Sequence, residues 1–264
     1  MQLDVIGIGA INFDYIFYCK KLEYKNRLKP EFGQEYLTAS VRETLEDEID
    51  TLMFTTPHDV QFCGSAYFAI KTINAIYPDL KTSYVGVCGK PTLREKKAGF
   101  SGNAKDEFEF LYNKDWLFFD DGPPGIALIR LFRGTRNWID INAGVNNNLV
   151  KYIKLQKEKL GKDSFVDFLA SSKWVHISSL ADFAQFQYLV SEIAKAKEKN
   201  PWMKVSFDPG YEYTKKYRLQ LMDAFKISDY IFLNQNEVDN LTGNSSLKGE
   251  NKYSNDYKLR ISLM

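Results

Sequence analysis

Short apolar runs that end in glycine set the pattern at the start of the chain. Residues 3–8 are almost continuously apolar and meet Gly7 and Gly9, which predicts a buried strand that runs into a tight turn. Residues 12–17 then alternate polar and apolar side chains, as a strand with one solvated face does. Residues 20–60 are polar, charged and weakly periodic, so the pattern does not order their elements.

The middle of the chain predicts one helix, one strand and one hairpin. Apolar residues recur at helical spacing over 64–76, and Pro78 is a stop signal for that helix. A short β-type run follows at 83–87. Residues 125–134 and 136–141 are two β-rich runs around an Arg-Gly-Thr turn, which predicts a β-hairpin.

The second half of the chain alternates strand and helix patterns. Strands are predicted at 174–177, 204–207 and 230–233, with helices at 183–200 and around 217–225 between them. This alternation is typical of parallel βαβ units. Ligands of such sheets bind at the carboxyl ends of the strands, so we expect the functional site there.

Composition and charge exclude several classes of protein. Lysine and arginine number 35 against 34 aspartates and glutamates, so the chain lacks the basic excess of a nucleic-acid binder. The N-terminus lacks the basic region of a signal peptide, and no stretch is apolar enough to span a bilayer. The three cysteines have no metal-ligand spacing. We expect a cytoplasmic protein with no nucleic-acid or membrane partner.

The Gly7-Ile-Gly9 pair invites comparison with a dinucleotide-binding fingerprint. That fingerprint needs a third small residue at position 12 and a helix directly after it. Asn12 stands at that position and a strand is predicted to follow. The pattern therefore favours glycines that serve a turn over the site of a nicotinamide oxidoreductase.

Asn12 and Asp14 are the first candidate binding residues. They share one face of the predicted strand, just after the carboxyl end of a buried one. An amide and a carboxylate at this place could hold sugar hydroxyls by paired hydrogen bonds. A strand whose polar face meets water would show the same spacing, and the spacing leaves both interpretations open.

The run from Gly9 to Ile16 resembles the opening of the ribokinase-like (PfkB) carbohydrate and nucleoside kinases, in which the corresponding Asn and Asp face the sugar. Cys63-Gly64-Ser65-Ala66 resembles the Gly-Gly motif of that family, whose backbone approaches the substrate closely. Further stretches fit in the same order, at 84–89, 125–127, 134–136 and 144–146. The resemblance thus implies Asn12, Asp14, Gly64 and Ser65 as substrate-binding residues.

Residues 228–243 give the sharpest match, because they are similar to the family's strand ending in Asn-x-x-Glu and the helix that closes on Leu-Thr-Gly. The resemblance implies that Asn234 and Glu237 bind the nucleotide and that Glu237 organises hydrated magnesium. Mg²⁺ keeps most of its waters, so one carboxylate beside the phosphates can hold it. Taken alone, the motif also fits a helix N-terminus that Asn caps and Glu stabilises.

The resemblance implies an α/β fold: a Rossmann-like, mostly parallel sheet with helices on both faces, plus a small β lid. Residues 1–243 would form the core, with a lid from about 10–60 and 118–141, and 244–264 a polar tail. The implied function is ATP- and Mg²⁺-dependent phosphorylation of a sugar or nucleoside hydroxyl. The implied partner is that small molecule, and the lid could also form a homodimer.

Three positions depart from the family pattern: Cys63 for the first glycine of the pair, Phe68 for an asparagine of the substrate helix, and Lys90 for an aspartate. Phe68 bears most on substrate choice, since an aromatic ring cannot replace the hydrogen bonds of an amide. Nothing after Gly243 resembles the family's Asp-Thr-x-Gly-Ala-Gly-Asp segment, which holds its anion hole and catalytic base. We therefore assign no catalytic residue, and expect a C-terminally truncated chain with negligible kinase activity alone or, alternatively, a non-catalytic sugar-binding protein.

Overall fold

The computed structural model describes residues 2–20, 37–39, 41–101, 103–132, 135–178, 180 and 182–242. The polar tail predicted at 244–264 lies outside the described residues. Residues 21–36 also lie outside them, and they belong to the 20–60 segment whose elements the sequence pattern did not predict.

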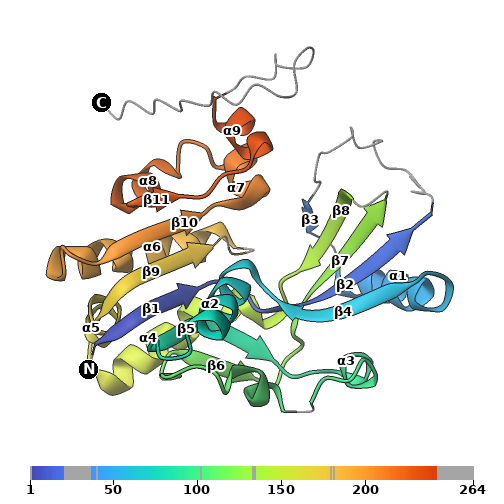
Figure 1. Ribbon diagram of the computed structural model, residues 1–264, viewed down its shortest axis with the longest axis horizontal. Helices are drawn as coiled ribbons and strands as arrows, with labels where there is room; N and C mark the ends of the chain where they lie inside the picture. Colours follow the sequence, from blue (N-terminus) through green and yellow to red (C-terminus); the bar gives the residue numbers. More distant parts are fainter. Residues whose placement is uncertain are drawn as a thin grey trace.

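Six strands form one sheet in which every neighbouring pair is parallel (Figure 1). The order across the sheet is β11 (Tyr230–Ile231), β10 (Lys204–Asp208), β9 (Ser172–Ser178), β1 (Leu3–Ile8), β5 (Thr82–Gly89) and β6 (Leu117–Asp120). β1 lies in the interior, where Ile8 is opposite Val85 of β5 and Ile177 of β9. Parallel pairing places the carboxyl ends of all six strands at one edge.

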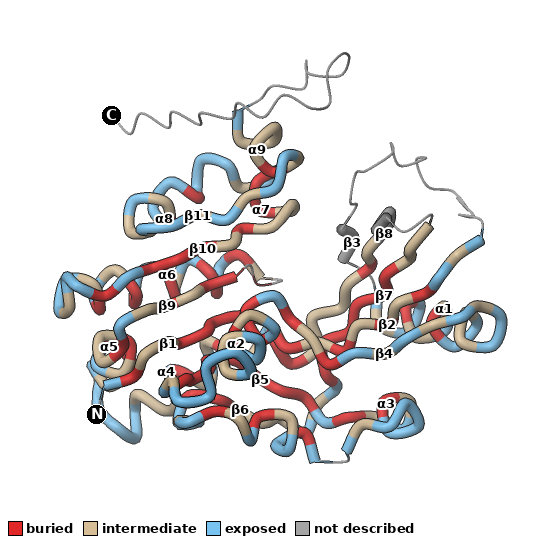
Figure 2. The backbone as a smooth tube through the Cα atoms, in the orientation of Figure 1, coloured by how far each residue is buried: buried red, intermediate tan, exposed pale blue. Residues whose placement is uncertain are grey.

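Helices cover both faces of this sheet, which confirms the predicted α/β fold. On one face, Ile6, Ile8 and Val85 are fully buried in a core shared with α4 (Leu149–Leu160), α5 (Ser164–Ala170) and α6 (Phe183–Lys199). Successive side chains of a strand point to opposite faces of the sheet, so β1 and β5 also have side chains on the other face. There α2 (Ser65–Ile76) packs against both strands. Figure 2 shows the buried residues concentrated along these inner strands.

Two predictions for this half of the chain need correction. The single helix expected around 217–225 is two short helices, α7 (Gly210–Lys216) and α8 (Met222–Ile227). The chain leaves α7 at Tyr217, whose ring stacks on Phe183 of α6 at 3.9 Å between centroids. The strand expected at 230–233 keeps only Tyr230 and Ile231 in the sheet.

Five strands form a second sheet in the order β3 (Leu37–Ala39), β8 (Thr135–Asn142), β7 (Gly125–Phe132), β2 (Asn12–Cys19) and β4 (His58–Cys63). The β7–β8 pair is antiparallel, as the predicted hairpin requires, and β2 runs parallel to β7. Helix α1 (Arg42–Thr55) packs on one face, where Leu45 and Ile49 join Phe13 and Phe17 in a second core. The other face is turned toward the six-stranded sheet (Figure 1).

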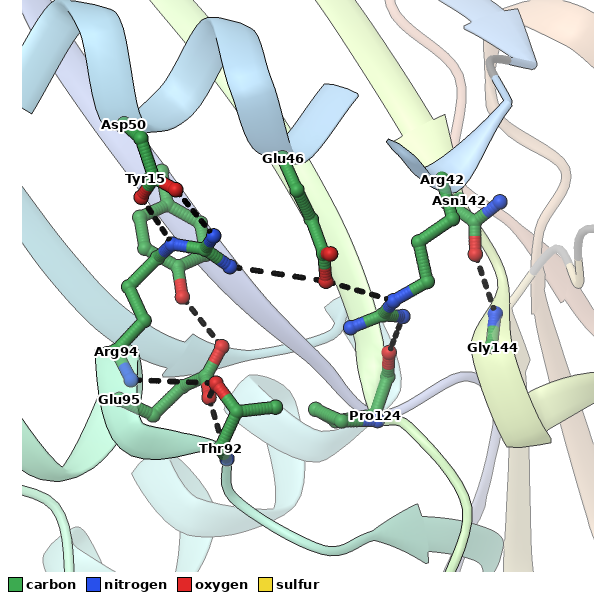
Figure 3. Close-up of polar contacts among 10 residues, drawn as sticks. All are labelled: Tyr15, Arg42, Glu46, Asp50, Thr92, Arg94, Glu95, Pro124, Asn142 and Gly144. Carbon is green, nitrogen blue, oxygen red and sulfur yellow. Dashed lines mark hydrogen bonds and ion pairs between the residues drawn. The ribbon is translucent and has the colours of Figure 1, made fainter. Parts of the chain in front are cut away.

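Ion pairs and hydrogen bonds join α1 to its surroundings (Figure 3). Arg94 of α3 (Leu93–Lys97) forms a bidentate pair with Asp50, at 2.7 and 2.8 Å, and also contacts Glu46. Arg42 pairs with Glu46 at 2.8 Å and donates to the carbonyl of Pro124 at 2.7 Å. This chain of charges fixes α1 to the segment that leads into β7.

The remaining described elements are the 3₁₀ turns η1 (Ala104–Phe108) and η2 (Gly144–Asn148) and the helix α9 (Gln235–Thr242). Within the described part of the chain, no helix is long and apolar enough to cross a membrane.

Candidate functional site

A cleft of about 1400 Å³ lies between the two sheets, at the carboxyl-end edge of the parallel one. All six residues singled out from the sequence line it: Asn12, Asp14, Gly64, Ser65, Asn234 and Glu237. Pockets that bind small molecules commonly measure about 300–1,000 Å³, so this cleft has room for more than one ligand.

Asn12 begins β2, three residues after Gly9, and its position is set by Asn146 of η2. The Nδ2 atom of Asn146 donates to Asn12 Oδ1 at 3.0 Å and to the carbonyls of Ile11 and Ala143, each at 2.9 Å. Its Oδ1 accepts from the backbone N–H of Ile11 at 2.9 Å. Asn146 is 3% exposed, so these bonds form in a protected interior.

The space next to the side-chain amides of Asn12 and Asn146 admits only a glycine at position 125. A Cβ atom at position 125 would lie 2.1 Å from Asn12 Oδ1 and 2.3 Å from Asn146 Nδ2. Since real Cβ atoms do not come that close to other atoms, any side chain at 125 would displace one of the two amides. The start of β7 therefore helps to position Asn12.

Asp14 lies two residues along β2, on the same side as Asn12. Across the second sheet it is level with Ala127 of β7 and, one strand further, with Ile141 of β8. All three side chains line the cleft. In the lining of the cleft, the Asp14 carboxylate therefore lies between the polar side chain of Asn12 and the apolar side chains of the two neighbouring strands.

Gly64 and Ser65 form the start of α2. Gly64 is the N-cap residue, with φ of 135°, a backbone conformation that favours glycine. A Cβ atom there would also lie 2.1 Å from the carbonyl oxygen of Ala10, in the segment between β1 and β2. The glycine thus lets the N-terminus of α2 approach the backbone of Ala10 and Ile11 closely.

Asn234 and Glu237 bind each other at the N-terminus of α9. Asn234 donates from its backbone N–H to Glu237 Oε2 at 2.9 Å and from Nδ2 to Oε1 at 2.8 Å. The backbone N–H of Glu237 donates in return to Asn234 Oδ1 at 3.1 Å. This is a reciprocal helix cap, and it buries Glu237 to 5% exposure. The capping interpretation of the motif is therefore seen directly, in residues that also line the cleft.

Asn146, Asn142, Asp208 and Glu212 also line the cleft but were not assigned as site residues from the sequence. Asp208 ends β10, and burial raises the pKa of its carboxyl although the N–H of Gly210 opposes the shift. Its place in an Asp-Pro-Gly sequence at a strand end was a usable signal. Asn146 belongs to the 144–146 stretch of the resemblance, but its bonds to Ile11 and Asn12 join positions about 135 residues apart, which the local sequence does not show.

Carboxylates dominate the charge of the cleft. Among its described lining residues Lys216 is the only lysine or arginine, and it pairs with Glu212 at 2.5 Å. The described residues contain no group of three or more His, Cys, Asp or Glu side chains that could hold a metal ion. Glu237 places one carboxylate in the lining of the cleft, and hydrated Mg²⁺ needs only one or two carboxylates because it otherwise keeps its waters.

Solved structures share the fold. Ribokinase from Giardia lamblia aligns with a TM-score of 0.62 at 18% identity, over 92% of this chain and 60% of that one. Adenosine kinase from Sinorhizobium meliloti gives 0.62 at 17%, over 92% and 68%. Arabidopsis thaliana ribokinase complexed with ribose and ATP gives 0.55 at 17%, over 92% and 64%. The fold is therefore ribokinase-like, and the chain spans 60–68% of the length of these three proteins.

Neither a protein-family model nor a curated protein sequence matches the chain.

Proposed function

We propose that the cleft binds a sugar or nucleoside and that this compound accepts a phosphoryl group from ATP in the whole protein. One observation carries the proposal. Asn12 and Asp14, the Gly64–Ser65 helix start and the Asn234–Glu237 cap come from three distant parts of the chain, yet all of them line one cleft.

Asn12 and Asp14 would bind the acceptor. Because Asn12 Oδ1 already accepts from Asn146, the amide offers its Nδ2 as a donor, whereas Asp14 offers a charged acceptor. Neighbouring hydroxyls of a sugar can each donate and accept, so such a pair fixes their orientation. The five-stranded sheet would act as a lid that excludes water, which otherwise competes as an acceptor.

Asn234 and Glu237 would lie beside the nucleotide phosphates. Their reciprocal cap fixes the Glu237 carboxylate, which could then hold the waters of Mg²⁺. Bound Mg²⁺ would supply positive charge that neutralises the phosphate oxygens during transfer. In this arrangement the acceptor hydroxyl would attack the γ-phosphate in line, and the bond from the γ-phosphorus to the bridging oxygen would break to release ADP.

A second candidate is binding without phosphoryl transfer. None of the residues that line the cleft is assigned as the catalytic base, which leaves binding without transfer as the alternative. General-base catalysis contributes about 10²- to 10⁴-fold in rate, so a chain without it should bind but turn over poorly.

Calorimetric titration with D-ribose and adenosine, with and without Mg–ATP, tests the proposal. Asp14→Asn should weaken acceptor binding about tenfold or more, because a charged hydrogen-bond acceptor becomes neutral. Asp79→Asn, at an exposed position away from the cleft, is the control and should bind as the unaltered chain does. If no sugar or nucleoside binds, or if Asp14→Asn changes nothing, the proposed site is wrong. An ATP turnover assay on the same samples separates the two candidates.

A homodimer formed through the lid stays a prediction. Light scattering with size-exclusion chromatography tests it, and a monomer at all concentrations would contradict it.

A further inference from the structure

We propose that the acceptor is a nucleoside rather than a free sugar, with its base bound between Phe68 and an apolar wall of the lid. The inference rests on the proposed function, since it takes Asn12 and Asp14 as the residues that hold the sugar hydroxyls. It names the chemical class that the same cleft would select.

The apolar wall is defined as Ala127, Ile129, Ile139 and Ile141, all of which line the cleft. Strand alternation explains why they share a face. In β7, Ile126 and Leu128 are fully buried in the core under α1, so Ala127 and Ile129 point the other way.

Strand β8 obeys the same alternation. Asp140 points into the protein, where it is fully buried and pairs with Arg130 at 2.7 Å. Ile139 and Ile141, on either side of it, therefore face the cleft, and both keep part of their surface exposed. The wall is thus an aliphatic face across two paired strands, in which Ala127 and Ile129 are each 3% exposed and the two isoleucines of β8 are more exposed.

The strand register places this wall next to the proposed sugar site. Asp14 is paired with Ala127, and Ala127 with Ile141. Neighbouring strands lie about 4.8 Å apart, so Ile141 is about 10 Å from Asp14 across the sheet. A group attached to a sugar held at Asp14 would therefore be within reach of the apolar wall.

Phe68 adds an aromatic surface to the same cleft. It lies in the first turn of α2, three residues after Ser65, and is 58% exposed. A large aromatic side chain left this open in a cleft offers a face on which a flat ring can stack. It offers no hydrogen bond to a hydroxyl.

A free sugar fits this wall poorly. Its ring carries hydroxyls on most carbons, and those that meet Phe68, Ile139 or Ile141 would lose water without gaining a partner there. A nucleobase presents an aromatic face instead, so its burial is favourable. The cleft should therefore discriminate in favour of the nucleoside.

The test compares adenosine and D-ribose as calorimetric probes of the 264-residue chain and two cleft variants. The unaltered chain should bind adenosine at least about tenfold more tightly than ribose. Phe68→Asn should weaken adenosine binding at least about fivefold, the loss expected for one base–aromatic stack, and change ribose binding less than about twofold. Ile141→Thr keeps a β-branched residue in the strand and should also weaken adenosine selectively.

Phe54→Asn is the matched control, since Phe54 is 92% exposed on α1 and does not line the cleft. Both ligands should bind this variant as they bind the unaltered chain. If ribose binds as tightly as adenosine, or Phe68→Asn and Ile141→Thr both leave adenosine binding unchanged, the inference is overturned and the proposed function stands. If neither ligand binds, the proposed function fails, and this inference with it.

Discussion

The side-chain amide of Asn146 donates a hydrogen bond to Asn12 across 134 residues of sequence, at 3.0 Å. The same Asn146 also holds both backbone polar groups of Ile11. The segment after the β7–β8 hairpin thereby fixes the point where the chain passes from the parallel sheet into the five-stranded sheet. Asn12 is positioned in the lining of the cleft by this contact as much as by its own strand.

Replacement of Asn146 by alanine should lower the free energy of unfolding by about 2–4 kcal/mol, because it leaves the N–H and C=O of Ile11 buried without their partner. Asn146→Asp keeps the shape and the acceptor but loses the donors, so it should also destabilise. Urea denaturation measures both. Asn147→Ala, at the exposed neighbouring position, is the stability control, and equal losses at 146 and 147 would contradict this role.

Replacement of Gly64 by alanine should cost more than backbone strain alone. Gly161 has a similar backbone conformation, with φ of 114° against 135° at Gly64, but nothing lies within 4 Å of a Cβ atom built there. Gly161→Ala should therefore lower stability by about 1–3 kcal/mol through strain. Gly64→Ala should lose at least about 1 kcal/mol more, because its Cβ overlaps the carbonyl of Ala10. Thermal or urea unfolding that ranks the two variants equally would show that the close approach is unimportant.

Glu237→Gln should lower stability by about 1 kcal/mol, since the new amide places a donor against a donor of Asn234. Under the proposed function it should also weaken ATP binding in the presence of Mg²⁺ more than in its absence. Asp239→Asn is the control, because it removes a charge from a half-buried position of the same helix that does not line the cleft. Calorimetric titration with ATP, in the presence and absence of Mg²⁺, measures this difference in affinity. A stability loss with unchanged Mg²⁺-dependent affinity would leave Glu237 a cap alone.

Asp229 should make stability depend on pH in the acid range. Partial burial opposes ionisation, but hydrogen bonds from Lys197, from the N–H of Val205 and from Lys204 lower the pKa of Asp229 from 3.8 to about 2. A lowered pKa means that the contribution is present above about pH 4 and is lost as the pH falls toward 2. We expect about 1 kcal/mol, after allowance for solvent screening of a pair at the surface.

The measurement is the stability difference between the unaltered chain and Asp229→Asn at pH 6 and pH 3. The difference should be smaller at pH 3, because Asp229 is then largely protonated in the unfolded chain although it is still mostly ionised in the folded one. A difference that stays constant between the two pH values would rule out this carboxylate as the origin.

The hydrophobic pattern predicted the parallel half of the molecule best. Strand β1, the helix over 183–199 and strand β10 follow from local periodicity, because each buries apolar side chains on a face or faces set by its own geometry. The β7–β8 hairpin followed from two β-rich runs around one turn.

Helix α1 could not be predicted in this way. Leu45 and Ile49 are its only buried residues, and much of its attachment is through charged side chains such as Arg42 and Asp50. The Asp50–Arg94 ion pair and the bond from Arg42 to Pro124 form only when segments distant in the sequence come together, so the local sequence shows a polar segment without clear periodicity.

The sequence motifs that line the cleft could be recognised, but the contacts that position their side chains could not. Asn12, Asp14 and Gly64 lie in short runs whose spacing can be read from the sequence. The dependence of Asn12 on Asn146 and Gly125 cannot be read there, since it requires the lid to bring three segments together.

The most direct test of the central claim is a crystal structure of this chain with adenosine bound. The account predicts ribose hydroxyls within hydrogen-bond distance, about 2.6–3.2 Å, of Asn12 and Asp14, with the base between Phe68 and Ile141. Adenosine bound outside the cleft, or in it without contact to Asp14, would contradict the account.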